Sequence, residues 1–171
     1  MKVIFLDIDG VLNDHKAWPN RCGRICYERV EHLNKVLCAV PDAKIVLSSA
    51  WRYSFPEANT IMALLMAHGC DCLHRVHGAT DLDPVLENRP AWTERAEWNR
   101  LGKVWRKQQI LDYVERHEIT AWVVIDDLAL DLPNLVLTDC DIGLTAEKAV
   151  EAVEILNKGE KNEPRVTEAK E

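Results

Sequence analysis

Two carboxylates near the start of the chain have the types and the spacing of a metal site. Asp7 and Asp9 follow the apolar run Val3–Leu6, which is short enough to be a buried strand. In a strand, residues two apart point to the same side, so both carboxylates would project together, roughly 6–7 Å apart at their Cα atoms. Such a pair repels itself unless a cation lies between, and a hard divalent cation such as Mg²⁺ prefers oxygen ligands. Gly10 then allows a sharp turn close to a ligand; the alternative is an ordinary acidic turn.

Apolar runs of strand length alternate with segments of helical spacing along the rest of the chain. The expected strands are residues 3–6, 43–47, 72–76, 120–125 and 135–138. The expected helices are residues 27–40, 57–68 and 103–117, with a last helix that Thr145 caps and that runs to about residue 156. Acidic residues follow the first and the fourth strands. The alternation therefore predicts an open, mostly parallel α/β sheet whose site lies in the crevice at the carboxyl ends of the strands.

The segment FLDIDGVLN resembles motif I of the haloacid dehalogenase (HAD) superfamily of phosphatases and phosphotransferases, an apolar strand followed by D-x-D-G-[TV]-[LI]. The resemblance extends from residue 3 to about residue 156. It implies a HAD-like Rossmannoid three-layer sandwich with a mostly parallel five-stranded sheet. The implied domain spans residues 1–157, with residues 81–102 as an insert or small cap, and residues 158–171 form a charged tail that we expect to be disordered.

The second motif of this superfamily is a Ser or Thr at the end of the second strand, which donates a hydrogen bond to the phosphoryl group. Ser48 matches that position. Ser49 and the following backbone N–H groups could also bind the phosphate if a helix begins there. Arg52 is a candidate phosphate or substrate contact. The alternative is that the serines only cap the next helix.

The third motif is a Lys, or sometimes an Arg, near the start of the helix before the fourth strand. The resemblance implies that its charge offsets the carboxylates and the phosphate. Arg106 and Lys107 are the best-placed candidates, and Lys103 is the third. Basic residues are common on helix surfaces, so this motif is weak by itself.

The fourth motif is the acidic pair after the fourth strand, Asp126 and Asp127, which by resemblance completes the metal site. Asp131 is a spare acid that matches a longer variant of the motif. The four motifs together imply that Mg²⁺ is held by the carboxylates of Asp7 and Asp126 and by the backbone carbonyl of Asp9. Asp127 would be a further ligand or would contact the ligands without touching the ion.

The resemblance also implies a phosphohydrolase that forms an aspartyl-phosphate. Asp7 would attack phosphorus. Asp9 would protonate the leaving oxygen and then deprotonate the hydrolytic water. An Asp at position 9 favours phosphatase over dehalogenase chemistry, because cleavage of an alkyl halide needs no general acid there.

Several segments are similar to the HAD domains associated with Swiss army knife RNA-repair proteins: VLSSAWR, Gly78–Thr80, the Asp-Asp pair and LVLTDCDIGLT. This resemblance implies a substrate that is a nucleotide or a phosphorylated nucleic-acid end. The insert at residues 81–102 departs from those domains. Its Trp92 and Trp98, interleaved with arginines, could stack on a base or sugar, or could simply anchor a helical insert to the core.

The length, hydrophobic content and net charge of the chain limit the kinds of function that it can have. The chain has 171 residues, 47% of them hydrophobic, and a net charge of −7, which suits one globular domain and argues against broad coating of nucleic acid. A single nucleic-acid end stays open as a substrate. There is neither a long apolar run nor a signal-peptide pattern, so we expect no membrane segment and a cytoplasmic location.

The six cysteines are expected to be reduced and mostly buried. Cys70, Cys72 and His74 have a spacing that could place three zinc ligands on one strand face, but the usual paired spacing of zinc sites is missing. Incidental thiols in a strand are the favoured interpretation.

Two other functions stay open. The chain could be a small-molecule phosphatase for a sugar phosphate or a nucleoside monophosphate, or a catalytically silent binding protein with the HAD fold. The sequence does not indicate an oligomeric state.

Overall fold

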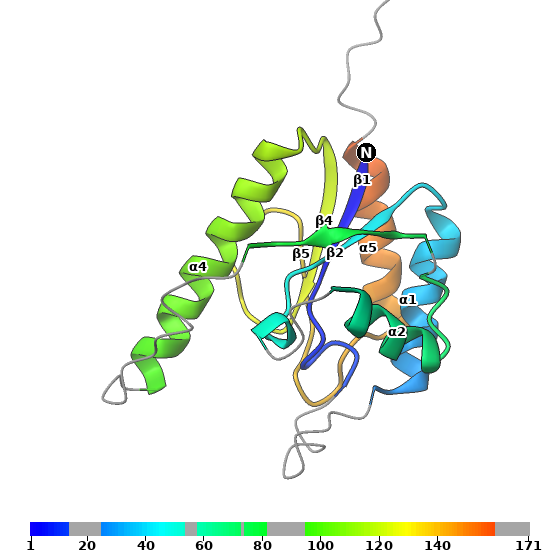
Figure 1. Cartoon of the computed structure of the whole chain (residues 1–171), viewed down its shortest axis with the longest axis horizontal. Helices are drawn as coiled ribbons and strands as arrows, with labels where there is room; N and C mark the ends of the chain where they lie inside the picture. Colours follow the sequence, from blue (N-terminus) through cyan, green and yellow to red (C-terminus); the bar gives the residue numbers. More distant parts are fainter. Residues whose placement is uncertain (14–24, 54–57, 73, 82–94, 160–171) are drawn as a thin grey trace, which may run out of the picture.

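The computed structural model describes residues 1–13, 25–53, 58–72, 74–81 and 95–159, which form an α/β fold (Figure 1). Within them, five parallel strands make one sheet in the order β3-β2-β1-β4-β5. The strands are β1 (Lys2–Leu6), β2 (Lys44–Leu47), β3 (Val76–Ala79), β4 (Ala121–Asp126) and β5 (Leu135–Leu137). The expected Rossmannoid architecture is confirmed, and the strands described are all parallel.

Helices lie on both faces of this sheet and make it the middle of three layers. Helices α1 (Tyr27–Ala39), α2 (Ala58–Ala67) and α5 (Ala146–Lys158) pack on one face, and α4 (Arg95–Arg116) packs on the other (Figure 1). A short 3₁₀ helix, η2 (Ala50–Tyr53), follows β2. Thr145 caps α5 as expected, because its side chain accepts the N–H of Lys148 at 3.3 Å. No helix in the described ranges is both long and apolar enough to cross a membrane.

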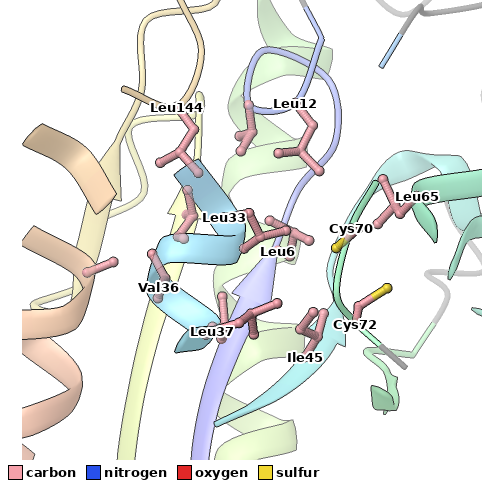
Figure 2. Packing of buried hydrophobic residues seen from close by; sticks show 14 of the residues in the cluster. Leu6, Leu12, Leu33, Val36, Leu37, Ile45, Leu65, Cys70, Cys72 and Leu144 are labelled. Atoms are coloured by element: carbon pink, nitrogen blue, oxygen red, sulfur yellow. The ribbon is translucent and has the colours of Figure 1, made fainter. Parts of the chain in front are cut away.

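The central strand β1 is buried over its whole length because both of its faces are covered. Alternate side chains point to opposite faces. Ile4 and Leu6 therefore join the cluster under α1, α2 and α5, and Val3 and Phe5 join the cluster under α4. Figure 2 shows part of the first cluster, including Leu6, Leu33, Val36, Leu37 and Ile45.

The register of β1 with its two neighbours positions the candidate site. Leu6 lies opposite Leu47 of β2 and Ile125 of β4. The residues that follow these three positions are Asp7, Ser48 and Asp126, and they lie side by side at the carboxyl edge of the sheet. The ladder continues past the strand ends: Ser48 N–H donates to Leu6 O at 3.0 Å, and Asp7 N–H donates to Ile125 O at 3.0 Å.

The third strand begins later than we expected. It covers Val76–Ala79 instead of residues 72–76. Cys70 and Cys72 precede it and are buried near Leu65 (Figure 2). His74 has a positive φ of 63°, which interrupts an extended chain. Cys72 is buried, whereas His74 is exposed and forms a turn with Arg75, so the strand begins only at Val76.

The helix before β4 begins earlier than we expected. It starts at Arg95 instead of residue 103, so the last part of the expected insert is helical. Gly102 weakened the helical pattern, but a glycine within a helix costs only about 1 kcal/mol relative to alanine and does not end it. The rest of the expected insert, residues 82–94, and most of the expected tail, residues 160–171, lie outside the described ranges.

Candidate active site

Three carboxylates gather at the carboxyl ends of β1 and β4. Asp7, Asp126 and Asp127 each offer an oxygen, and these oxygens lie within 4.8 Å of one another. Asp7 is 3% exposed, and Asp126 is completely buried. Carboxylates this close and this buried repel each other and lose their hydration, so they require positive charge or protons nearby.

Arg106 supplies one positive charge to this group from the facing helix α4. Its Nη1 donates to Asp7 Oδ2 at 2.5 Å and to Asp126 Oδ2 at 2.8 Å. Burial alone would lower the pKa of the Arg106 guanidinium, but the negative charges of Asp7 and Asp126 outweigh it and raise that pKa. The guanidinium therefore stays protonated and matches the cation expected from the third motif.

Helix geometry explains why Arg106 reaches the carboxylates and Lys107 does not. Arg106 precedes the buried Ile110 and Tyr113 by four and seven residues, so it lies on the helix face that covers the sheet. Lys107 is rotated from it by about 100° and instead pairs with Asp131 at 2.7 Å. The Asp131 side chain is 99% exposed. The structure thus separates Lys107 and Asp131 from the three carboxylates.

The charge of Arg106 does not offset the burial of Asp126. Burial, followed by the negative charge of Asp7, raises the pKa of Asp126 to about 7, although Arg106 opposes the shift. The donor set consists of hard carboxylate oxygens with negative charge left over, which is the chemistry that a Mg²⁺ ion matches. The residues present therefore fit the implied cofactor.

A tight turn after β1 supports the carboxylates. Asp7 Oδ1 accepts the N–H of Ile8 at 2.8 Å. Gly10 has a φ of +70°, and a Cβ added to it would lie 2.5 Å from Asp127 Oδ2. The position therefore requires glycine both for its backbone and for the close approach of Asp127.

Thr138, after β5, holds the same turn from the other side. Its hydroxyl donates to the carbonyl of Gly10 at 2.8 Å, and both groups are buried. The N–H of Leu144 donates to Val11 O at 2.9 Å. In the sequence, the segment LVLTDCDIGLT stands out only through the resemblance, and the structure gives Thr138 a supporting role that its spacing could not reveal.

Asp9 does not join the three carboxylates with its side chain. Strand β1 ends at Leu6, so the same-side rule for strands does not extend to Asp7 and Asp9. The Asp9 carboxylate is exposed, and its Oδ1 accepts hydrogen bonds from Asn13 Nδ2 at 2.7 Å and Trp51 Nε1 at 2.9 Å. The expectation that both carboxylates project together is corrected: the two groups have separate partners.

Ser48 and Ser49 follow β2 and are both fully buried. The hydroxyl of Ser48 has no hydrogen-bond partner within the described chain. Ser49 Oγ instead accepts the N–H of Trp51 at 3.3 Å at the start of η2. Capping therefore accounts for Ser49, whereas Ser48 keeps a buried hydroxyl available beside Asp7.

Arg52 is buried, and its guanidinium binds protein oxygens. It donates to Thr80 Oγ1 at 2.6 Å and Asp81 O at 3.0 Å, and its Nε donates to Ser49 O at 2.7 Å. It also donates to the carbonyl of Thr80. Arg52 thus ties the chain after β2 to the chain after β3, and its contact with substrate stays a prediction.

The remaining expected residues divide into two groups. Trp92 and the side chain of Trp98 lie outside the described part of the chain. Cys70, Cys72 and His74 are described, but they are absent from the groups of described side chains close enough to share a metal ion. Burial in the hydrophobic core accounts for both thiols.

A parallel Rossmannoid sheet, with acids gathered after two adjacent central strands and a cation facing them, is the arrangement that the HAD resemblance implied. Comparison with family models agrees. The model described as "HAD domain in Swiss Army Knife RNA repair proteins" matches residues 3–149, and the chain belongs to this family. Searches of curated proteins and of solved structures found no match.

Proposed function

We propose that the chain is a Mg²⁺-dependent phosphohydrolase that acts through an aspartyl-phosphate, on nucleotides or phosphorylated nucleic-acid ends. One observation carries the proposal: the buried carboxylates of Asp7 and Asp126 share Arg106, and the buried hydroxyl of Ser48 follows the neighbouring strand. A nucleophile, a cation and a hydroxyl donor at one sheet edge are the groups that phosphoryl transfer requires.

Asp7, Asp126 and Asp127 would hold Mg²⁺, together with the backbone carbonyl of Asp9. When bound, the ion reduces the repulsion between an anionic nucleophile and an anionic substrate.

The side chains divide the remaining chemistry between two steps. In the first, an Asp7 oxygen forms a bond to phosphorus while the bond to the leaving oxygen breaks, and that oxygen takes a proton from Asp9. In the second, a water attacks phosphorus, Asp9 takes a proton from the water, and the bond to Asp7 breaks. Ser48 and Arg106 would bind the phosphoryl oxygens in both steps.

The substrate class rests on the family. Its description names RNA-repair proteins, which favours a phosphorylated RNA end or a nucleotide. The net charge of −7 favours recognition of one local phosphate over a long backbone. The same acidic charge supports a second candidate, a small-molecule phosphatase for sugar phosphates or nucleoside monophosphates.

The test is phosphate release from p-nitrophenyl phosphate, with and without Mg²⁺, for the wild type and for Asp7→Asn. Wild-type release should depend on Mg²⁺, and Asp7→Asn should lower it by about 10³-fold or more because the nucleophile is lost. Asp131→Asn is the matched control, since the same change at an exposed acid should leave release near the wild-type rate.

Wild-type activity in a pure preparation of Asp7→Asn would refute the aspartyl-phosphate route. Oligonucleotides with 3′- or 5′-phosphates, compared with mononucleotides and sugar phosphates, then identify the substrate class. A wild-type protein that releases phosphate from none of these in Mg²⁺ would instead be a binding protein.

A further inference from the structure

The carboxylate of Asp9 is bound on one side only. Its Oδ1 accepts two hydrogen bonds, one from Asn13 and one from Trp51. Within the described chain, Oδ2 accepts none. The residue is exposed, and an exposed aspartate without such partners would sample several rotamers. Two short hydrogen bonds to Oδ1 therefore fix the direction of the Asp9 side chain, and they leave Oδ2 as the oxygen that no described residue binds.

On the basis of the proposed phosphohydrolase function, we propose that Trp51 and Asn13 are positioning residues: they hold Asp9 by Oδ1 and leave Oδ2 to exchange the proton with the leaving group and the water.

The donor chemistry of the two partners decides which oxygen carries the proton. The indole N–H of Trp51 and the NH₂ group of Asn13 both donate to Oδ1 and cannot accept a hydrogen bond from a proton there, and a protonated Oδ1 would keep too few lone pairs for both donors. The amide of Asn13 is fixed as well, because its Oδ1 accepts the N–H of Gly10 at 3.0 Å and its NH₂ group is thereby directed to Asp9. A proton on Asp9 must then reside on Oδ2.

Trp51 and Asn13 both lie in segments that also contain other residues of the site. Trp51 lies in η2, directly after the Ser48-Ser49 pair, and its side chain packs against the core on the α1 side. Its backbone N–H is bound by Ser49 Oγ. Asn13 is 3% exposed and closes the turn that begins at Asp7. A rigid, partly buried indole is a more precise support than a solvent-exposed side chain.

Two phosphate esters whose leaving groups differ in basicity test the positioning role. A general acid matters most when the leaving oxygen is basic, and little when the leaving group departs easily as an anion. Trp51→Phe removes the N–H and keeps an aromatic ring. Because kcat/KM reports phosphoryl transfer to Asp7 and not the later water step, which is common to both esters, we expect the variant to lower kcat/KM about tenfold or more for phenyl phosphate, a fraction of the whole general-acid effect, and to leave kcat/KM for 2,4-dinitrophenyl phosphate within about twofold. Asn13→Ala should show the same selectivity.

Trp122→Phe is the matched control. Trp122 lies on β4, packs edge-on against Phe5 with ring centroids 6.0 Å apart, and belongs to the opposite face of the sheet. The same chemical change there should leave the ratio of the two rates unchanged. In an Asp9→Ala background, Trp51→Phe should have no further effect on that ratio, because a positioning residue acts only through the group it positions.

A second measurement needs no catalysis. Trp51→Phe identifies the indole N–H resonance of Trp51 in a ¹H–¹⁵N spectrum. That resonance should move upfield in Asp9→Ala and stay in place in Asp131→Ala.

The outcomes are distinct. An equal loss of kcat/KM with both esters in Trp51→Phe, or an unmoved resonance in Asp9→Ala, would overturn the positioning role while the phosphohydrolase stands. Absence of Mg²⁺-dependent release by the wild type from both esters and from the oligonucleotides, mononucleotides and sugar phosphates named above would overturn the phosphohydrolase proposal, and the positioning role with it.

Discussion

Replacing Arg106 by methionine would remove the guanidinium that lies between Asp7 and Asp126 while it keeps most of the side-chain length. The three side chains are 13%, 5% and 0% exposed, so water cannot take over the lost hydrogen bonds without a rearrangement. Both carboxylates would then remain buried without this positive charge.

The expected loss of stability follows from this burial. Removing one partner of a buried ion pair typically costs about 3–5 kcal/mol, because the other charge stays uncompensated. For a chain of this size, each kcal/mol corresponds to roughly 2–4 °C, so Tm should fall by roughly 6–20 °C in the absence of divalent cations. The loss should be greatest near pH 8. It should shrink towards pH 5, because Asp126, whose pKa is already raised to about 7, can then take a proton in place of the lost cation.

The measurement is urea or thermal unfolding of Arg106→Met in EDTA and in Mg²⁺. Lys107→Met is the control, because it makes the same change one residue along the same helix, at an ion pair whose acid is exposed. Mg²⁺ should restore part of the stability lost in Arg106→Met. If Arg106→Met in EDTA is no less stable than Lys107→Met, the argument that Arg106 compensates the buried acids is refuted.

Three further predictions concern the same site. Ser48→Ala should lower kcat/KM about 10- to 100-fold and leave the free energy of unfolding unchanged or higher, because the buried Ser48 hydroxyl has no partner to lose; a marked loss of stability in urea would contradict this. Gly10→Ala should cost about 1–2 kcal/mol at a φ of +70° and weaken Mg²⁺ binding, measured by titration calorimetry, because its Cβ would displace Asp127; wild-type Mg²⁺ affinity would argue against that contact. The rise in Tm caused by Mg²⁺ should be larger at pH 8 than at pH 5, because the pKa of Asp126 is raised from 3.8 to about 7 and a proton competes with the ion below it; equal rises at both pH values would rule out this competition.

The sequence was sufficient for the parts of the site that depend on strand ends. Parallel strands in register bring their carboxyl ends to one edge, so Asp7, Ser48 and Asp126 could be placed together from the apolar runs that precede them. The choice between Arg106 and Lys107 was also within reach, because only Arg106 continues the helix face of Ile110 and Tyr113.

Other features depend on contacts between distant segments, and local patterns do not encode them. Thr138 reaches Gly10 across 128 residues of sequence. The direction of Asp9 is set by Trp51, which follows a different strand. Arg52 has the residue type of a phosphate contact, and only the positions of Thr80 and Asp81 show that its donors bind the protein itself. In each case the residue type is compatible with several partners, and the tertiary fold selects one.

The electrostatic balance of the site links the fold to the proposed chemistry. Within the described chain, three carboxylates meet the guanidinium of Arg106 at the end of β1 and β4, and burial raises the pKa of Asp126 to about 7 although Arg106 opposes the shift. Apolar residues in place of a whole buried ion-pair cluster are often neutral or stabilising, so stability alone gives no reason for this charged cluster at the sheet edge. Binding of a divalent cation does give a reason, because it removes the same repulsion that makes the metal-free site costly. The buried carboxylates of Asp7 and Asp126, whose repulsion weakens the fold without metal, are thus the groups that would make Mg²⁺ bind there.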